Sequence, residues 1–165
     1  MSPVIDGRYK EAIHKPRLRR LEWVFSCVPI YFVTACAHSR GRWLACPAIH
    51  ESLIAFCSRG AERGAFVGRY VLMPDHVHLF VAFQPGTITL SAWMKSLKNS
   101  LSKVLRGMDK RTPHWQDGFF DHVLRSSESY EQKWLYVRDN PVRAGLVSHW
   151  QEWPYQGEIV WIDRA

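Results

Sequence analysis

The stretch PDHVHLFVAF at residues 74–83 decides the fold, because it places two histidines ahead of a run of β-forming residues. Successive side chains of a strand point to opposite faces, so His76 and His78 share one face and Val77 lies on the other. Two imidazoles at this spacing can hold one metal ion. The same pattern also occurs as two polar residues on an exposed strand face, and residues further along the chain are needed to choose between these interpretations.

The composition is that of one globular domain. The chain has 165 residues, of which 47% are hydrophobic, enough to bury a single core and too many for a disordered chain. No apolar run approaches the ~18 residues of a membrane span, and the N-terminus lacks the apolar core of a secretory signal. Four cysteines without a C-x-x-C pair favour reduced thiols. We therefore expect a single domain over residues 23–165, in the cytoplasm and away from membranes.

The charge of the chain indicates an acidic partner. The formal net charge is +7, and nucleic acid is the commonest polyanion available to a protein. Eight Trp, eight Phe and six Tyr add faces on which single-stranded bases can stack. Residues 1–22 hold six of the cations and are predicted to form a basic N-terminal arm, which either contacts nucleic acid or is a solvated tail.

Local patterns predict a mixed fold. β-Branched and aromatic runs indicate strands, the pattern at residues 47–60 indicates a helix, and Thr89 is a suitable cap for a second, strongly amphipathic helix. The predicted elements are strands at 29–37, 65–72, 74–83 and within 115–125, and helices at 47–60, after Thr89 and at 127–138. The economical arrangement is an α+β fold, a ferredoxin-like antiparallel sheet with helices on one face.

The last predicted helix carries an aromatic residue that its apolar stripe does not explain. The stripe follows from helical spacing and consists of Tyr130, Trp134 and Val137, whereas Tyr136 lies on the polar flank. Tyr136 is therefore either a functional group or a surface tyrosine with a partly covered ring. Asn140 precedes a proline, where it can cap the next helical turn, serve as a ligand, or do both.

Two motifs together resemble a known family. The segments MPDHVH at 73–78 and YVRDNPVRAGLV at 136–147 are similar to those of the single-tyrosine HUH transposases. The segment at 115–125 and the WPY at 153–155 resemble the branch of REP-associated tyrosine transposases, which are tied to repeated extragenic palindromes. The resemblance covers residues 24–156, and it implies the ferredoxin-like sheet that the local patterns also predict.

The resemblance implies roles for four residues. His76 and His78 would be metal ligands, Tyr136 the nucleophile and Asn140 the third ligand, a position at which some branches of the family have glutamine. The implied activity is that of a metal-dependent single-stranded DNA endonuclease and strand transferase. It would act on hairpin or palindromic DNA through a covalent 5′-phosphotyrosine. Two imidazoles and an amide oxygen suit Mg²⁺ or Mn²⁺, and geometry does not exclude Zn²⁺.

The basic residues then become candidates for DNA contacts. The predicted DNA-binding residues are Arg17, Arg19, Arg20, Lys95, Lys98, Lys103, Lys133, Arg138 and Arg143. The tyrosine has to lose its proton, with help from the metal or from a cation such as Lys133. Both a monomer and a homodimer are compatible with the resemblance. The alternatives are a hairpin-DNA or RNA binding module without turnover, and a zinc hydrolase, which lacks an evident general-base carboxylate.

Overall fold

The computed structural model describes residues 28–125 and 127–162, so the predicted basic arm with Arg17, Arg19 and Arg20 lies outside the described residues. A five-stranded antiparallel sheet has the strand order β4-β1-β3-β2-β5. Its strands are β1 (Ile30–Cys36), β2 (Ala65–Leu72), β3 (His76–Phe83), β4 (Phe120–Leu124) and β5 (Gln156–Glu158). The histidine strand β3 is therefore the central strand, paired on both edges.

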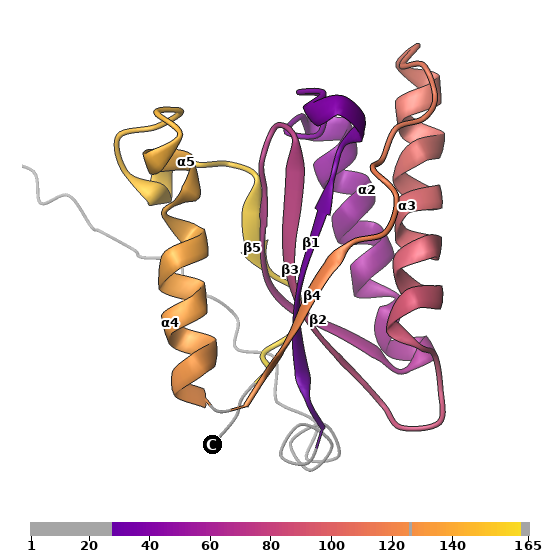
Figure 1. Ribbon diagram of the computed structural model, residues 1–165, viewed down its shortest axis with the longest axis vertical. Coiled ribbons are helices and arrows are strands. Elements are labelled where there is room, and N and C mark those ends of the chain that lie inside the picture. Colours follow the sequence, from indigo (N-terminus) through magenta and orange to yellow (C-terminus); the bar gives the residue numbers. More distant parts are fainter. Residues whose placement is uncertain (1–27, 126, 163–165) are drawn as a thin grey trace, which may run out of the picture.

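Helices cover both faces of this sheet (Figure 1). The α-helices are α2 (Pro47–Ser58), α3 (Leu90–Gly107), α4 (Ser127–Arg138) and the single turn α5 (Asn140–Arg143). The 3₁₀ turns of the described residues are η1 (His38–Arg40), η2 (Gly60–Arg63) and η3 (Trp150–Glu152). Within the described part of the chain, no helix combines the length and the apolar character needed to cross a bilayer.

The first face is covered by α2 and α3. Leu79 and Val81 of β3 pack there in one core with Trp93 and Leu97 of α3, all fully or almost fully buried. The predicted cap of α3 is confirmed, because the hydroxyl of Thr89 accepts a hydrogen bond from the backbone N–H of Ala92 at 3.2 Å.

The second face is covered by α4, which corrects the prediction that the helices lie on one face. Phe80 of β3 is fully buried, with its ring 4.7 Å from that of Tyr130 and 6.3 Å from that of Trp134. The reason is that alternate residues of β1 and β3 are apolar on both sides, so the sheet has two faces to bury. The predicted α+β antiparallel fold is otherwise confirmed.

The turn that precedes β3 is held by the segment after β1. The backbone N–H groups of Ala37 and Leu44 donate to the carbonyl oxygens of Asp75 and Pro74 at 2.8 and 2.9 Å. The indole N–H of Trp153 donates to the carbonyl of Leu72 at 3.1 Å from the other side. The backbone that presents the two histidines is therefore fixed by contacts from distant parts of the chain.

Candidate active site

The two histidines lie side by side on the α4 face of the sheet. Their ring centroids are 4.7 Å apart and the rings are nearly perpendicular. In the neighbouring strand β1, Thr34 is directly opposite His78 and Cys36 is opposite His76. The predicted shared orientation of His76 and His78 is thus the arrangement that the sheet produces.

Each histidine is held by a hydrogen bond at its own Nδ1 atom. Nδ1 of His76 lies 2.7 Å from a carboxylate oxygen of Asp75, and Nδ1 of His78 lies 2.8 Å from the hydroxyl of Thr34. The other carboxylate oxygen of Asp75 forms an ion pair with Nε of Arg40 at 3.1 Å. With both Nδ1 atoms engaged, both Nε2 atoms are left for a ligand, which is the arrangement of many metal-binding histidines.

Burial and nearby cations keep His78 neutral. Burial, followed by the positive charges of His76, Lys133, Arg143 and Arg40, lowers the pKa of His78 to about 3. Its imidazole is therefore unprotonated at neutral pH, as a ligand must be.

Asp75 stays ionised beside the histidines. Burial alone would raise the pKa of Asp75, but the hydrogen bond with His76 and the charges of His76 and Arg40 lower it overall. An ionised carboxylate accepts the Nδ1 hydrogen of His76 and so fixes the tautomer whose Nε2 is free.

A stack of side chains connects α4 to the histidines. The ring of Phe32 is stacked on His78 at 5.3 Å, and the ammonium nitrogen of Lys133 lies 5.2 Å from the centroid of the Phe32 ring. Tyr136 follows on the same helix, with 64% of its surface exposed. It borders an open hollow of about 270 Å³, which is lined by His122, Leu124, Ser129, Gln132, Lys133 and Tyr136. The tyrosine is thus presented to solvent on the helix that packs beside the histidine pair.

Asn140 begins α5 instead of capping it. Asp139 occupies the N-cap position, and the side-chain oxygen of Asn140 accepts a hydrogen bond from the guanidinium of Arg143. The same guanidinium lies 4.1 Å above the ring of Tyr136. The turn therefore gathers the predicted nucleophile, the predicted third ligand and an arginine. Figure 1 shows it at the end of the sheet where β1 ends and β3 begins.

The donor set suits a divalent cation. Within residues 28–125 and 127–162, no three or more His, Cys, Asp and Glu side chains are gathered as metal ligands. The imidazoles of His76 and His78 and the amide oxygen of Asn140 are nevertheless a chemically suitable set, since such mixed nitrogen and oxygen ligands bind Mn²⁺ and Mg²⁺ with positions left for substrate. The residues present therefore fit the ion that the sequence motifs imply.

The predicted DNA-binding residues fall into two groups. Lys133, Arg138 and Arg143 come from α4 and α5, on the histidine face. Arg138 is paired with Asp139 at 3.1 Å and lies over the ring of Trp150. Lys133 and Arg143 therefore border the candidate site, whereas the contacts of Arg138 are with Asp139 and Trp150.

The second group, Lys95, Lys98 and Lys103, comes from α3 on the opposite face. Lys98 donates to the carbonyl oxygens of Gln116 and Gly118, so it anchors the loop before β4. Burial lowers the pKa of Lys98, against the opposing effect of Asp117. Lys95 and Lys103 are exposed.

Three contributors to the site were missed by the sequence analysis. Thr34 and Phe32 contact His78 across the strand pair, and Arg40 reaches Asp75 from the turn after β1. A prediction that paired the first strand with the histidine strand in the correct register would have brought Thr34 opposite His78. No local pattern singles out Arg40.

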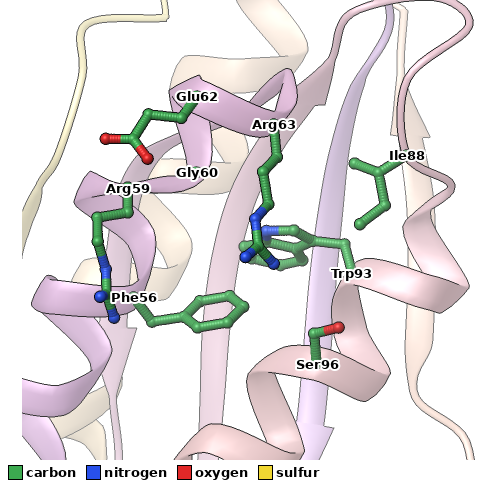
Figure 2. Close-up of a pocket in the computed structure, with 8 residues that line it drawn as sticks. All are labelled: Phe56, Arg59, Gly60, Glu62, Arg63, Ile88, Trp93 and Ser96. Carbon is green, nitrogen blue, oxygen red and sulfur yellow. The ribbon is translucent and has the colours of Figure 1, made fainter.

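A separate cavity lies on the other face of the sheet (Figure 2). It has a volume of about 220 Å³ and lies between α2, η2 and α3. Its walls include Phe56, Arg59, Arg63, Ile88 and Trp93. None of the predicted catalytic or metal-binding residues borders it, so the candidate site is the one on the α4 face.

The fold agrees with the comparison to known families. Residues 30–140 match the family described as Transposase IS200 like, and the chain belongs to this family. It is 25% identical over 94 residues to the REP-associated tyrosine transposase of Escherichia coli K12, covering 57% of this chain and 54% of that protein. It is 24% identical over 94 residues to a putative REP-associated tyrosine transposase of Haemophilus influenzae, covering 51% of this chain and 53% of that protein. The chain thus spans about half the length of the curated relatives it matches.

A solved structure shares the fold. It is described as a REP-associated tyrosine transposase bound to a REP hairpin, and it aligns with a TM-score of 0.66 at 21% identity. The alignment covers 78% of this chain and 75% of that one. The resemblance to this branch, first indicated by the segments at 115–125 and 153–155, is confirmed by these relatives.

Proposed function

We propose that this protein is a metal-dependent DNA nicking and joining enzyme of the transposase type, which acts on single-stranded DNA with a hairpin or palindrome. The observation that carries the proposal is the stack of His78, Phe32 and Lys133, which brings the tyrosine helix beside the histidine pair within one chain. A DNA substrate and the free cysteines Cys36, Cys46 and Cys57 are consistent with a cytoplasmic location.

Three side chains would hold the metal ion. His76 and His78 offer Nε2, and Asn140 offers its amide oxygen. Mg²⁺ or Mn²⁺ bound there would polarise the scissile phosphate and orient it. Asp75 and Thr34 keep both rings in the orientation that this binding requires.

Tyr136 would supply the nucleophile. Its phenolic oxygen attacks the phosphorus, the bond from phosphorus to the 3′ oxygen breaks, and a 5′-phosphotyrosine forms. The phenol loses its proton to solvent or a nearby base, and the departing 3′ oxygen takes up a proton to become a free hydroxyl. Because one phosphodiester replaces another, a later attack by a 3′ hydroxyl can rejoin the strand.

The charge around the site supports a nucleic acid substrate. Lys133 and Arg143 lie close enough to His78 to lower its pKa, so positive potential converges where a phosphate would bind. The structural relative is described as bound to a REP hairpin, and we propose DNA hairpins as the substrate class here.

The test uses a 3′-labelled single strand that folds into a hairpin, incubated with the protein and Mn²⁺ or Mg²⁺. We expect strand cleavage and transfer of the label to the protein. The Tyr136→Phe variant should give neither product and should still shift the DNA in a native gel. Stable binding by the parent protein without cleavage would instead assign the chain to non-catalytic hairpin-binding modules.

A further inference from the structure

Arg143 contacts both the predicted nucleophile and the predicted third ligand. Its guanidinium donates to the side-chain oxygen of Asn140 and lies 4.1 Å above the ring of Tyr136. Residues 136, 140 and 143 follow the spacing i, i+4 and i+7, which places them on one side across the junction of α4 and α5. The three side chains therefore form one contact group at the edge of the site.

In the part of the chain that the structure describes, the positive charge of Arg143 is not neutralised by a carboxylate. Among residues 28–125 and 127–162, no Asp or Glu forms an ion pair with it, and the adjacent Asp139 is already paired with Arg138 at 3.1 Å. Arg143 is exposed, and a cation over an aromatic ring is weakly held at an exposed position. Its guanidinium is therefore free to move to a stronger anionic partner.

A metal ion at the site and the guanidinium of Arg143 would compete for the same ligand atom. Both need the amide oxygen of Asn140, which already accepts a hydrogen bond from the guanidinium of Arg143. Two cations that share one oxygen repel each other. Binding of the ion thus favours departure of the guanidinium from Asn140.

We propose that Arg143 is a latch that links metal binding to substrate binding. Without a bound ion, Arg143 holds Asn140 and lies over the ring of Tyr136. An ion that took the oxygen of Asn140 would release the guanidinium, which then contacts the substrate phosphate, for which its planar fork of donors is suited. This inference rests on the proposed function, since it assumes that Asn140 is a ligand and Tyr136 the nucleophile.

The test compares Arg143→Met and Arg143→Lys with Arg138→Met, which removes the same charge from a neighbouring position without touching Asn140. Mn²⁺ binding is measured by titration calorimetry on the full chain without DNA. Arg143→Met should bind Mn²⁺ more tightly than the parent by about threefold or more, because a competing cation is gone, and more tightly than Arg138→Met. Arg143→Lys keeps the charge but loses the fork, so its affinity should fall between those of the parent and Arg143→Met.

The second readout is the rate of covalent adduct formation with hairpin DNA at saturating Mn²⁺. It should fall by about tenfold or more in Arg143→Met, because a phosphate contact is lost even though the ion binds better. Tighter metal binding together with slower chemistry is a pattern that general damage to the site would not produce. Equal or weaker Mn²⁺ binding by Arg143→Met overturns the latch. If the parent forms no adduct, the proposed function fails, and the calorimetry still decides whether Arg143 competes with Mn²⁺.

Discussion

Asp75 accepts a hydrogen bond from the neighbouring His76 at 2.7 Å, and its second oxygen is held by Arg40 at 3.1 Å. A carboxylate fixed at both oxygens fixes the imidazole that it contacts, so the orientation of His76 depends on a residue outside the motif pair. Partners of this kind tune a metal site even though they do not touch the ion.

Removing the Asp75 carboxylate should weaken metal binding. In Asp75→Ala, Nδ1 of His76 loses its acceptor and the ring is free to rotate, so we expect Mn²⁺ affinity to fall by about tenfold or more. Asp75→Asn retains an oxygen that can accept the hydrogen bond, and it should lose less. Titration calorimetry measures both, and equal affinities for Asp75→Ala and the parent would show that Asp75 only shapes the turn.

Thr34 should act on His78 in the same way from the neighbouring strand. Thr34→Val keeps the shape of the side chain but leaves the part-buried Nδ1 of His78 without a partner, at a cost of about 1–3 kcal/mol in the free energy of unfolding. Mn²⁺ affinity should decrease as well, whereas Thr34→Ser, which restores a hydroxyl, should recover much of both. Urea denaturation and calorimetry on the three proteins test this, and an unchanged Thr34→Val variant would argue against the contact.

The lowered pKa of His78 leads us to predict how the stability of the protein depends on pH. Its pKa is about 3 in the folded protein, against about 6.5 for an unfolded histidine. Between these values the unfolded chain binds more protons at this residue, so its contribution to stability is present above about pH 6.5 and is lost as the pH falls toward 3. The free energy of unfolding should therefore drop between pH 7 and pH 5.

The control for this pH dependence is His78→Gln, which has no imidazole to protonate. Urea denaturation at the two pH values should show a smaller drop in His78→Gln than in the parent. Identical drops would mean that other groups, such as His50, whose pKa is also lowered by burial, account for the effect.

Lys133 should contribute to DNA binding through its charge. Lys133→Gln removes a cation from the histidine face, so the slope of log affinity against log salt should become shallower by about 0.7 for single-stranded DNA. Lys103 was also predicted from the sequence to bind DNA, but it lies on α3 on the opposite face. The slope of Lys103→Gln should therefore match that of the parent. Fluorescence anisotropy over a range of salt concentrations measures both. A larger effect of Lys103→Gln would place the DNA on the α3 side.

Most elements were predictable because their signals are local. The strand at 65–72 was predicted with the observed bounds, and the Thr89 cap was confirmed by its hydrogen bond. The short strand β5 (Gln156–Glu158) was missed. Three residues are too few to show an alternation of apolar and polar side chains, and they form a strand only by pairing with β2.

The motif residues of the site were predictable from their spacing, but their partners were not. Contacts such as Thr34 with His78 depend on the pairing register of two strands, which only the assembled sheet defines. The face on which α4 packs was also predicted incorrectly, because the apolar residues of β1 and β3 do not specify which face each helix covers. The roles of His76, His78, Tyr136 and Asn140 remain predictions.

The most direct test identifies the residue that becomes attached to DNA. The adduct formed with hairpin DNA and Mn²⁺ is digested with nuclease and trypsin and analysed by tandem mass spectrometry. Trypsin cleaves after Lys133 and Arg138, which releases a five-residue peptide containing Tyr136 as its only tyrosine. We predict that this peptide carries a nucleotide 5′-phosphate on Tyr136. A nucleotide on any other residue, or no adduct from the parent protein, would contradict the proposed function.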